Sequence, residues 1–216
     1  LLPEKSAARV NGFKGQLEGI SGVEFVADQD AWVQDDAVSV VNDILTAHPD
    51  VNLIFAANDG GTVGATMAVK NAGKAGSVAV FGIDASEQIA SMLQSDDNIL
   101  QAVTGQDAYT MGYQSMELLI KAIQGEDTGV EAGQILTVDG ILLDRQDQEG
   151  ISTFLTNLAE RTTVQAPNAL LKLIEEPPQN VFPATPLLQN QPERGNLNEY
   201  PGSASYDKGF SRHGGA

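Results

Sequence analysis

Two short apolar segments, with a helix-length pattern between them, constrain the fold of this chain more than any other feature. Leu53–Ala57 and Val78–Gly82 are nearly continuous apolar runs, and the sequence between them has the composition of a helix. Apolar strands that alternate with helices are typical of a parallel sheet with helices packed on its faces. The sequence therefore predicts an α/β fold built on a doubly wound parallel sheet.

A polar residue follows each of the two segments, Asn58 after the first and Asp84 after the second. In open α/β sheets, ligands bind beyond the carboxyl ends of the strands. We therefore expect Asn58 and Asp84 to lie side by side on the rim of one crevice.

The rest of the first 162 residues continues the alternation of helices and strands. Apolar residues three and four positions apart predict helices, and short apolar runs predict strands. The predicted helices are Ser6–Leu17, Val33–His48, Ser86–Leu93, Ala108–Ile123 and Gln148–Ala159. The predicted strands are Val23–Ala27, Leu100–Thr104, Ile135–Val138 and Ile141–Leu143.

Charge and cysteine content exclude several classes of function. The net charge of −17 disfavours a nucleic-acid partner, because an acidic surface repels phosphates. The chain contains no cysteine, which excludes disulfides and thiolate metal sites. No apolar run is long enough to span a bilayer, so no direct insertion into a membrane is expected. The chain opens with Leu1 inside a helix-entry pattern, and we expect its natural amino terminus to lie upstream.

A change in composition divides the chain near residue 162. Residues 1–162 contain 24 acidic and 8 basic residues, whereas residues 163–216 contain 5 and 4, together with seven of the nine prolines. We predict that residues 177–216 are mostly irregular or disordered, after one short helix over 166–176. The segment 163–216 is accordingly expected to be an irregular tail.

The sequence gives little support to catalysis, a metal or a cofactor. His48 lies at a predicted helix end and His213 in the tail. Gly60, Gly61 and Gly64 open a helix, but without the spacing of a dinucleotide or P-loop motif. Asp28 and Asp30 begin like a calcium loop, and then Trp32 replaces the next oxygen ligand. We expect no catalytic residue, no metal ligand and no cofactor.

Five side chains at strand ends and in loops form a more informative set. Each has a purely structural alternative, such as helix capping by Asn58 or Asp84 and core packing by Trp32. Together they supply an aromatic face, a bidentate donor, a carboxylate and two amides, which suits a sugar. The set is Arg9, Trp32, Asn58, Asp84 and Gln106.

The chain resembles the ligand-binding lobe of type I periplasmic solute-binding proteins of the ribose-binding kind. The matching stretches are SAARVNGFKG, LTAHPDVNLIFAANDGGTVGATMAVKNAGK, VAVFGIDAS and ILQAVTGQDAYTMGYQSMELLIKAIQGE. In that family an Arg of an RxxGF motif, a loop aromatic, the Asn of an ND pair, the Asp of a GFD-type motif and a Gln contact the sugar. By position these are Arg9, Trp32, Asn58, Asp84 and Gln106. Ile83 replaces the Phe that often precedes the Asp.

The resemblance implies a monosaccharide-binding component of an ABC importer, truncated at its amino terminus and without catalytic activity. Its implied partners are the sugar and the membrane subunits of the transporter. The implied location is the periplasm, or outside the cell with an anchor on a missing amino terminus. The implied organisation is a partial domain over 1–162. It comprises a carboxyl-terminal lobe (1–106), a helix of the missing lobe (107–130) and a return segment (131–162).

Two other functions remain open at the level of sequence. The effector domain of a LacI-type transcription regulator shares this fold, although Gly73–Ser77 lacks the Val-Pro-x-Asp approach typical of regulators. An enzyme of doubly wound fold is a further alternative, since the fold alone does not determine function. In the tail, residues 165–181 (QAPNALLKLIEEPPQNV) faintly resemble a motif of bacterial clamp-loader ATPases, and no function follows from so short a match.

Overall fold

The structure is a computed structural model that describes residues 3–131 and 133–162. The chain divides into two compact units, Leu1–Leu171 and Lys172–Ala216, and every described residue belongs to the first. The predicted helix over 166–176 and the predicted irregular tail lie outside the described residues.

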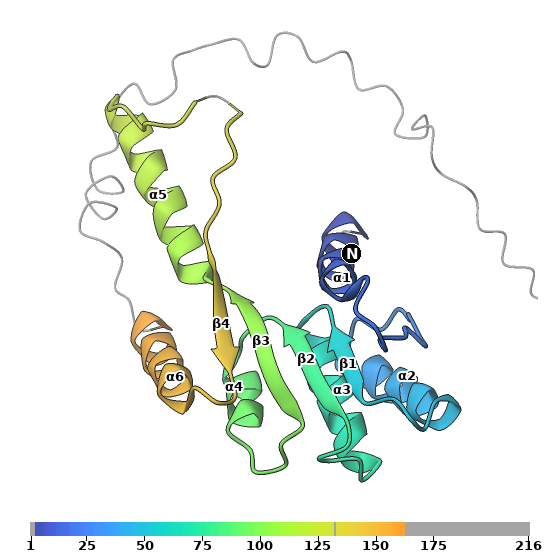
Figure 1. The fold of residues 1–216 in the computed structure, drawn as a ribbon. Helices are drawn as coiled ribbons and strands as arrows, with labels where there is room; N and C mark the ends of the chain where they lie inside the picture. Colours follow the sequence, from blue (N-terminus) through green and yellow to red (C-terminus); the bar gives the residue numbers. More distant parts are fainter. Residues whose placement is uncertain (1–2, 132, 163–216) are drawn as a thin grey trace, which may run out of the picture. The chain divides into compact units, whose positions relative to one another are not determined.

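A four-stranded sheet forms the centre of the first unit (Figure 1). Its strands are β1 (Leu53–Ala56), β2 (Ala79–Ile83), β3 (Leu100–Gln106) and β4 (Gly140–Asp144), in the order β1-β2-β3-β4. The first three strands are parallel, which confirms the α/β prediction.

The fourth strand departs from the predicted parallel sheet, because β4 runs antiparallel to β3. The chain leaves β3 at the carboxyl edge of the sheet and comes back to that same edge at Gly140, directly opposite Gln106. A strand that starts where its neighbour ends must run in the opposite direction. The predicted strand Ile135–Val138 is wrong, since these residues form no ladder.

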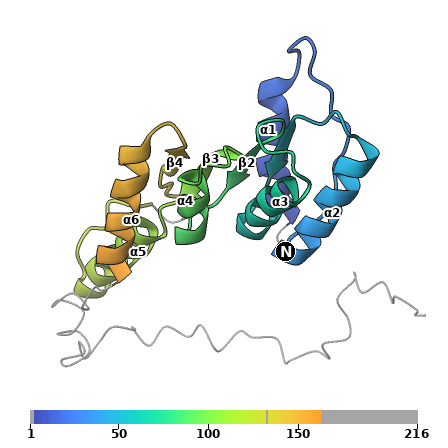
Figure 2. The same cartoon turned by 90° about the horizontal axis from the view of Figure 1, so that it is seen from below.

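Four helices lie on one side of the sheet in the view from below, three of them packed on strands and the first of them packed on its neighbouring helix (Figure 2). They are α2 (Gln34–Ala47), α3 (Asp59–Asn71), α4 (Glu87–Leu93) and α6 (Gln148–Thr162). The hydrophobic core joins them to the strands, for example through Val69 of α3, Ile89 of α4, Ile151 of α6 and Val80 of β2, all fully buried. Burial of these side chains is the main stabilising term of the unit.

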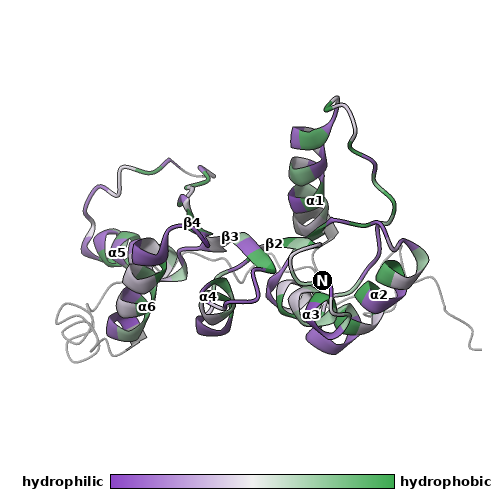
Figure 3. Cartoon of the chain, turned by 60° about the horizontal axis from the view of Figure 1, so that its bottom comes forward, coloured by the Kyte–Doolittle hydropathy of each residue, from purple (hydrophilic) through white to green (hydrophobic). Residues whose placement is uncertain are grey.

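The amino-terminal part contacts the sheet through an aromatic pair. Helix α1 (Pro3–Leu17) places Phe13 flat on Phe55 of β1, with ring centroids 4.3 Å apart. After α1, the predicted strand Val23–Ala27 is extended but pairs with no strand among the described residues, so that prediction is wrong. Figure 3 colours much of this segment as hydrophobic, and Phe25 is 47% exposed. Its backbone lacks the neighbour that a ladder requires.

Helix α5 (Ala108–Gln124) matches the predicted helix closely. Asp107 caps its first turn by accepting a hydrogen bond from the Thr110 amide, and Gly125 ends it in the left-handed conformation. No side chain of α5 is buried. Burial of side chains therefore stabilises α5 less than it stabilises the helices of the hydrophobic core.

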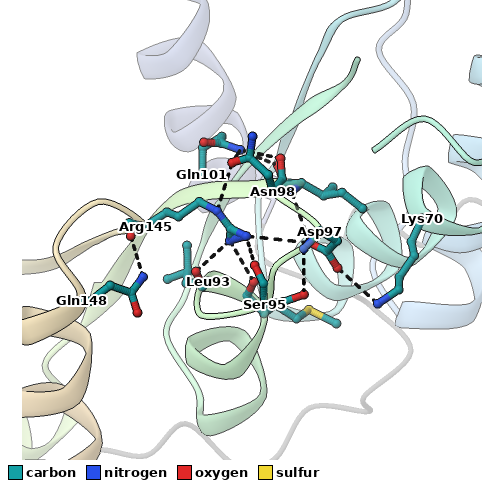
Figure 4. A network of polar contacts seen from close by, with 10 residues as sticks. Lys70, Leu93, Ser95, Asp97, Asn98, Gln101, Arg145 and Gln148 are labelled. Carbon is teal, nitrogen blue, oxygen red and sulfur yellow. Dashed lines mark hydrogen bonds and ion pairs between the residues drawn. The ribbon is translucent and has the colours of Figure 1, made fainter. Parts of the chain in front are cut away.

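A polar network fastens β4 to the turn between α4 and β3 (Figure 4). Arg145 donates hydrogen bonds to the carbonyl oxygens of Leu93 (2.7 Å) and Ser95 and to Oδ1 of Asn98 (3.1 Å). Its guanidinium also lies 3.9 Å from the carboxylate of Asp97. The Arg145 side chain thus provides hydrogen-bond donors for the last carbonyl groups of α4 and ties them to the end of β4.

Asp97 belongs to the same network and is held ionised. Burial raises its pKa, but hydrogen bonds with the Ser95 hydroxyl and the Ile99 amide, together with the charge of Lys70, outweigh that effect. The pKa of Asp97 therefore lies below its ordinary value.

Candidate ligand site

The carboxyl ends of the three parallel strands bring three of the five predicted side chains to one edge of the sheet. Asn58 follows β1, Asp84 follows β2 and Gln106 ends β3. Asp84 is the centre of the group, because Gln106 donates its side-chain amide to Oδ1 at 3.0 Å and the Asp59 backbone amide donates to Oδ2 at 3.1 Å. This adjacency is what parallel strand order predicts.

Arg9 reaches the same group from α1. Its Nη1 donates to the carbonyl oxygen of Ala57 at 2.8 Å, and its Nη2 lies 3.9 Å from Oδ1 of Asp84. The guanidinium has five N–H donors, of which these contacts occupy only part. Arg9 therefore joins α1 to the end of β1 and brings its guanidinium beside Asp84.

Asn58 is nearly buried, with 8% of its surface exposed. Its Oδ1 accepts a hydrogen bond from the Gly61 amide, which caps α3, and its Nδ2 donates to the carbonyl oxygen of Trp32 at 2.9 Å. The capping role that sequence offered as the structural alternative is therefore present. One hydrogen of Nδ2 remains for another acceptor.

Trp32 joins the group through its backbone rather than through its ring. Trp32 is an exposed residue, with 42% of its surface accessible. The segment that carries it borders a cavity of about 1320 Å³ between α1, α2 and β1. Trp32 and Asn58 line that cavity, whereas Arg9, Asp84 and Gln106 do not. The polar group thus lies at the margin of the cavity and not inside it.

Asp84 has an unusual backbone conformation. Its φ of 76° lies in the left-handed region, which non-glycine residues rarely adopt. The Asp84 amide donates to the carbonyl oxygen of Thr104 on β3, which holds the turn after β2 in place. Strained backbone conformations of this kind are concentrated at functional sites.

Thr62 supports the site from below and was not predicted from the sequence. Its hydroxyl lies 2.7 Å from the carbonyl oxygen of Asn58 and 3.1 Å from that of Ile83, so it can donate to either strand end. Thr62 is fully buried beneath Gly82, where a methyl group would meet Cγ2 of Thr62 at 2.5 Å. The only hint in the sequence was Gly82 itself, because a glycine inside a strand often marks the close approach of another part of the chain.

The group around Asp84 contains both hydrogen-bond donors and acceptors. A carboxylate offers about four acceptor positions, and two of those on Asp84 are used by Gln106 and Asp59. Within 3–131 and 133–162, no cluster of three or more His, Asp or Glu residues could hold a metal ion. No helix in the described part is both long and apolar enough to cross a membrane.

Comparison with known proteins gives a consistent picture. A family model described as "Periplasmic binding protein domain" matches residues 4–127. The ABC transporter periplasmic-binding protein YphF of Escherichia coli is 33% identical over 133 residues, which are 61% of this chain and 40% of that protein. The D-allose-binding periplasmic protein of E. coli is 31% identical over 53% of this chain and 37% of that protein.

A solved structure supports the same fold. The crystal structure of an ABC transporter periplasmic solute binding protein from Actinobacillus succinogenes with bound D-allose superposes with a TM-score of 0.59 and 30% identity. The match covers 65% of this chain and 48% of that one. The chain therefore spans about half or less of the length of the relatives it matches.

Proposed function

Because this chain belongs to the periplasmic binding protein domain family, we propose that it forms one wall of a monosaccharide-binding site in the binding component of an ABC importer. The observation that carries the proposal is the arrangement around Asp84, where Gln106 donates to the carboxylate and Arg9 lies 3.9 Å away. Sugar hydroxyls both donate and accept, and such a group can satisfy both functions.

Each residue has a distinct role in this proposal. Asp84 accepts hydrogen bonds from sugar hydroxyls, and Arg9 and Gln106 donate to sugar oxygens. The exposed ring of Trp32 stacks on a C–H face of the sugar. Asn58 contributes its remaining amide hydrogen and, through its bond to the Trp32 carbonyl, holds the aromatic loop beside the polar group.

We further propose that the chain contains one ligand-facing edge and pieces of a second lobe. Residues 1–106 form the first lobe, the helix within 107–130 packs on the second lobe, and 131–162 return to the first. The lack of any buried side chain in α5 supports this division. So does the register, since Gln106 and Gly140 stand opposite each other where the chain would leave and re-enter the lobe.

The remaining parts of the proposal follow from the family. The chain binds and releases a sugar without chemical change, works with the membrane subunits of a transporter, and acts in the periplasm or outside the cell. The named relatives, YphF and the D-allose-binding protein, are periplasmic binding proteins. They favour a receptor over a transcription regulator.

Calorimetric titration of common pentoses and hexoses tests the proposal. A second lobe that supplies about three or four hydrogen bonds, at roughly 1–1.5 kcal/mol each, makes binding about two to four orders of magnitude tighter. We therefore expect weak binding by this chain and tight binding by a fusion that carries the other lobe of a homologous receptor.

Variants of the fusion test the residue assignment. Asp84→Ala and Trp32→Ala should abolish or strongly weaken sugar binding, whereas Asp43→Ala, an exposed acidic residue on α2, should leave it unchanged. Tight binding by the short chain, or an unchanged affinity in the fusion, contradicts the two-wall proposal. Unchanged affinity in both site variants contradicts the assignment of the site.

A further inference from the structure

Helix α5 leaves the sheet at Gln106 and is largely exposed in the part of the chain that the structure describes. None of its side chains is buried. A helix without a buried face takes its direction from its connections to the chain and from a few specific contacts. The contacts at its first turn therefore decide how firmly it is held.

Arg161, near the end of α6, makes two contacts with that first turn. Its Nη1 lies 3.3 Å from Oδ1 of Asp107, the capping residue of α5. Its guanidinium carbon lies 4.6 Å from the centre of the Tyr109 ring, the geometry of a cation–π contact. Tyr109 in turn stacks on Tyr113, with ring centroids 6.2 Å apart.

We propose that Arg161 latches α5 to α6 and thereby fixes the direction in which α5 leaves the sheet. A single ion pair would leave α5 free to pivot about one point. The carboxylate and the ring are attached to successive parts of the first turn, so one planar guanidinium that contacts both restrains rotation as well as distance.

The charge of Asp107 suits this role. Hydrogen bonds from the Thr110 hydroxyl and amide lower the pKa of Asp107, and the charge of Arg161 lowers it further. The carboxylate stays ionised at neutral pH and serves α5 twice, as the cap of its first turn and as the partner of Arg161.

Pulsed electron paramagnetic resonance measures the direction of α5 in the full chain. The chain has no cysteine, so Gln88→Cys on α4 and Gln114→Cys on α5 give two unique, exposed labelling positions. In the native background we expect one narrow distribution of label distances. Arg161→Met should raise the population of displaced α5 orientations about fivefold, the factor expected for the loss of one exposed ion pair and one cation–π contact.

Two further variants complete the test. Lys121→Met removes a cation that pairs with Glu117 within α5 and should leave the distance distribution narrow. Asp107→Asn keeps a capping oxygen for the Thr110 amide and removes the charge, so it should broaden the distribution as Arg161→Met does. An unchanged distribution in Arg161→Met, or a native distribution already as broad, overturns the latch. These distances are read without ligand, so neither result bears on the sugar site.

Discussion

The side-chain amide of Asn58 donates a hydrogen bond to the backbone carbonyl of Trp32 at 2.9 Å, across 26 positions of sequence. The same side chain caps α3 through the Gly61 amide. One buried residue thus holds together the aromatic loop, the end of β1 and the start of the next helix. Any change at Asn58 should therefore affect both the stability of α3 and the position of Trp32.

Two substitutions at Asn58 separate these effects. Asn58→Ala removes the cap and the loop contact and should cost about 1–3 kcal/mol in urea unfolding followed by circular dichroism. Asn58→Asp keeps the capping oxygen and should cost less, while it shifts the emission of Trp32, the only tryptophan. Equal stability of Asn58→Ala and the native chain contradicts this view, as does unchanged emission in Asn58→Asp.

The close approach of Gly82 to Thr62 gives a second prediction. Gly82→Ala should destabilise the chain by about 1–3 kcal/mol, because the added methyl group overlaps Thr62 and displaces its hydroxyl. In a Thr62→Ala background the same change should cost clearly less. Gly112→Ala should instead increase helicity, because among the described residues the added carbon meets nothing within 4 Å beyond its own stretch of helix. Additive effects at Gly82 and Thr62 in chemical unfolding would show that the two sites do not interact.

Arg145, which fastens β4 to the turn after α4, and Arg161, near the end of α6, should differ in their effect on stability. The Arg145 side chain is 12% exposed and that of Arg161 is 38% exposed. Arg145→Met should cost about 1–3 kcal/mol, since it leaves the carbonyl oxygens of Leu93 and Ser95 without their charged donor. Arg161→Met should cost less than about 1 kcal/mol, as exposed pairs usually do. If urea unfolding showed the same loss of unfolding free energy in both variants, burial of the arginine would not determine the size of the loss.

Acid should weaken the network around Asp97. Its folded-state pKa lies below the ordinary value of 3.8, so its contribution is present at neutral pH and is lost as the pH falls through the folded pKa. The free energy of unfolding should therefore fall below about pH 4. In Asp97→Asn, which cannot titrate, this fall should be shallower than in the native chain. Parallel curves for the two proteins between pH 6 and about pH 3 would rule out this role for Asp97.

The exposed stripe of α5 should make the chain self-associate. Tyr109, Tyr113, Met116 and Leu119 are all exposed and lie along one side of the helix. In sedimentation velocity at increasing concentration, Leu119→Glu should weaken association about fivefold to tenfold. Gln114→Glu adds the same charge on the opposite side of α5 and serves as the control. A native chain that stays monomeric at high concentration contradicts the prediction.

Short-range patterns predicted most of the helices and the placement of Asn58 and Asp84 after two neighbouring parallel strands. The reason is that capping residues and apolar periodicity are local, and that parallel strands end at a common edge. The segment Val23–Ala27 was predicted as a strand on the same local grounds. It forms no ladder, because a strand depends on a partner that local sequence does not reveal.

Contacts between distant residues could not be predicted in the same way. Arg145 contacts Leu93 across 52 positions, and nothing near either residue indicates the other. The antiparallel direction of β4 likewise depends on the path of residues 107–139, which contain no local signal for it. The position of Thr62 beneath Gly82 depends on how α3 packs on β2, which only the fold determines.

Because Gln106 pairs with Gly140, residues 107–139 form an insertion between two adjacent strands of the sheet. The two residues face each other in one ladder, so the chain departs and comes back at neighbouring backbone positions. A two-residue Asn-Gly turn spans such a gap in an ordinary hairpin. Residues 107–139 could therefore be excised and the ends rejoined, leaving β3 and β4 paired. The paired strands β3 and β4 would then be separated from α5 by a single splice, with their ladder intact.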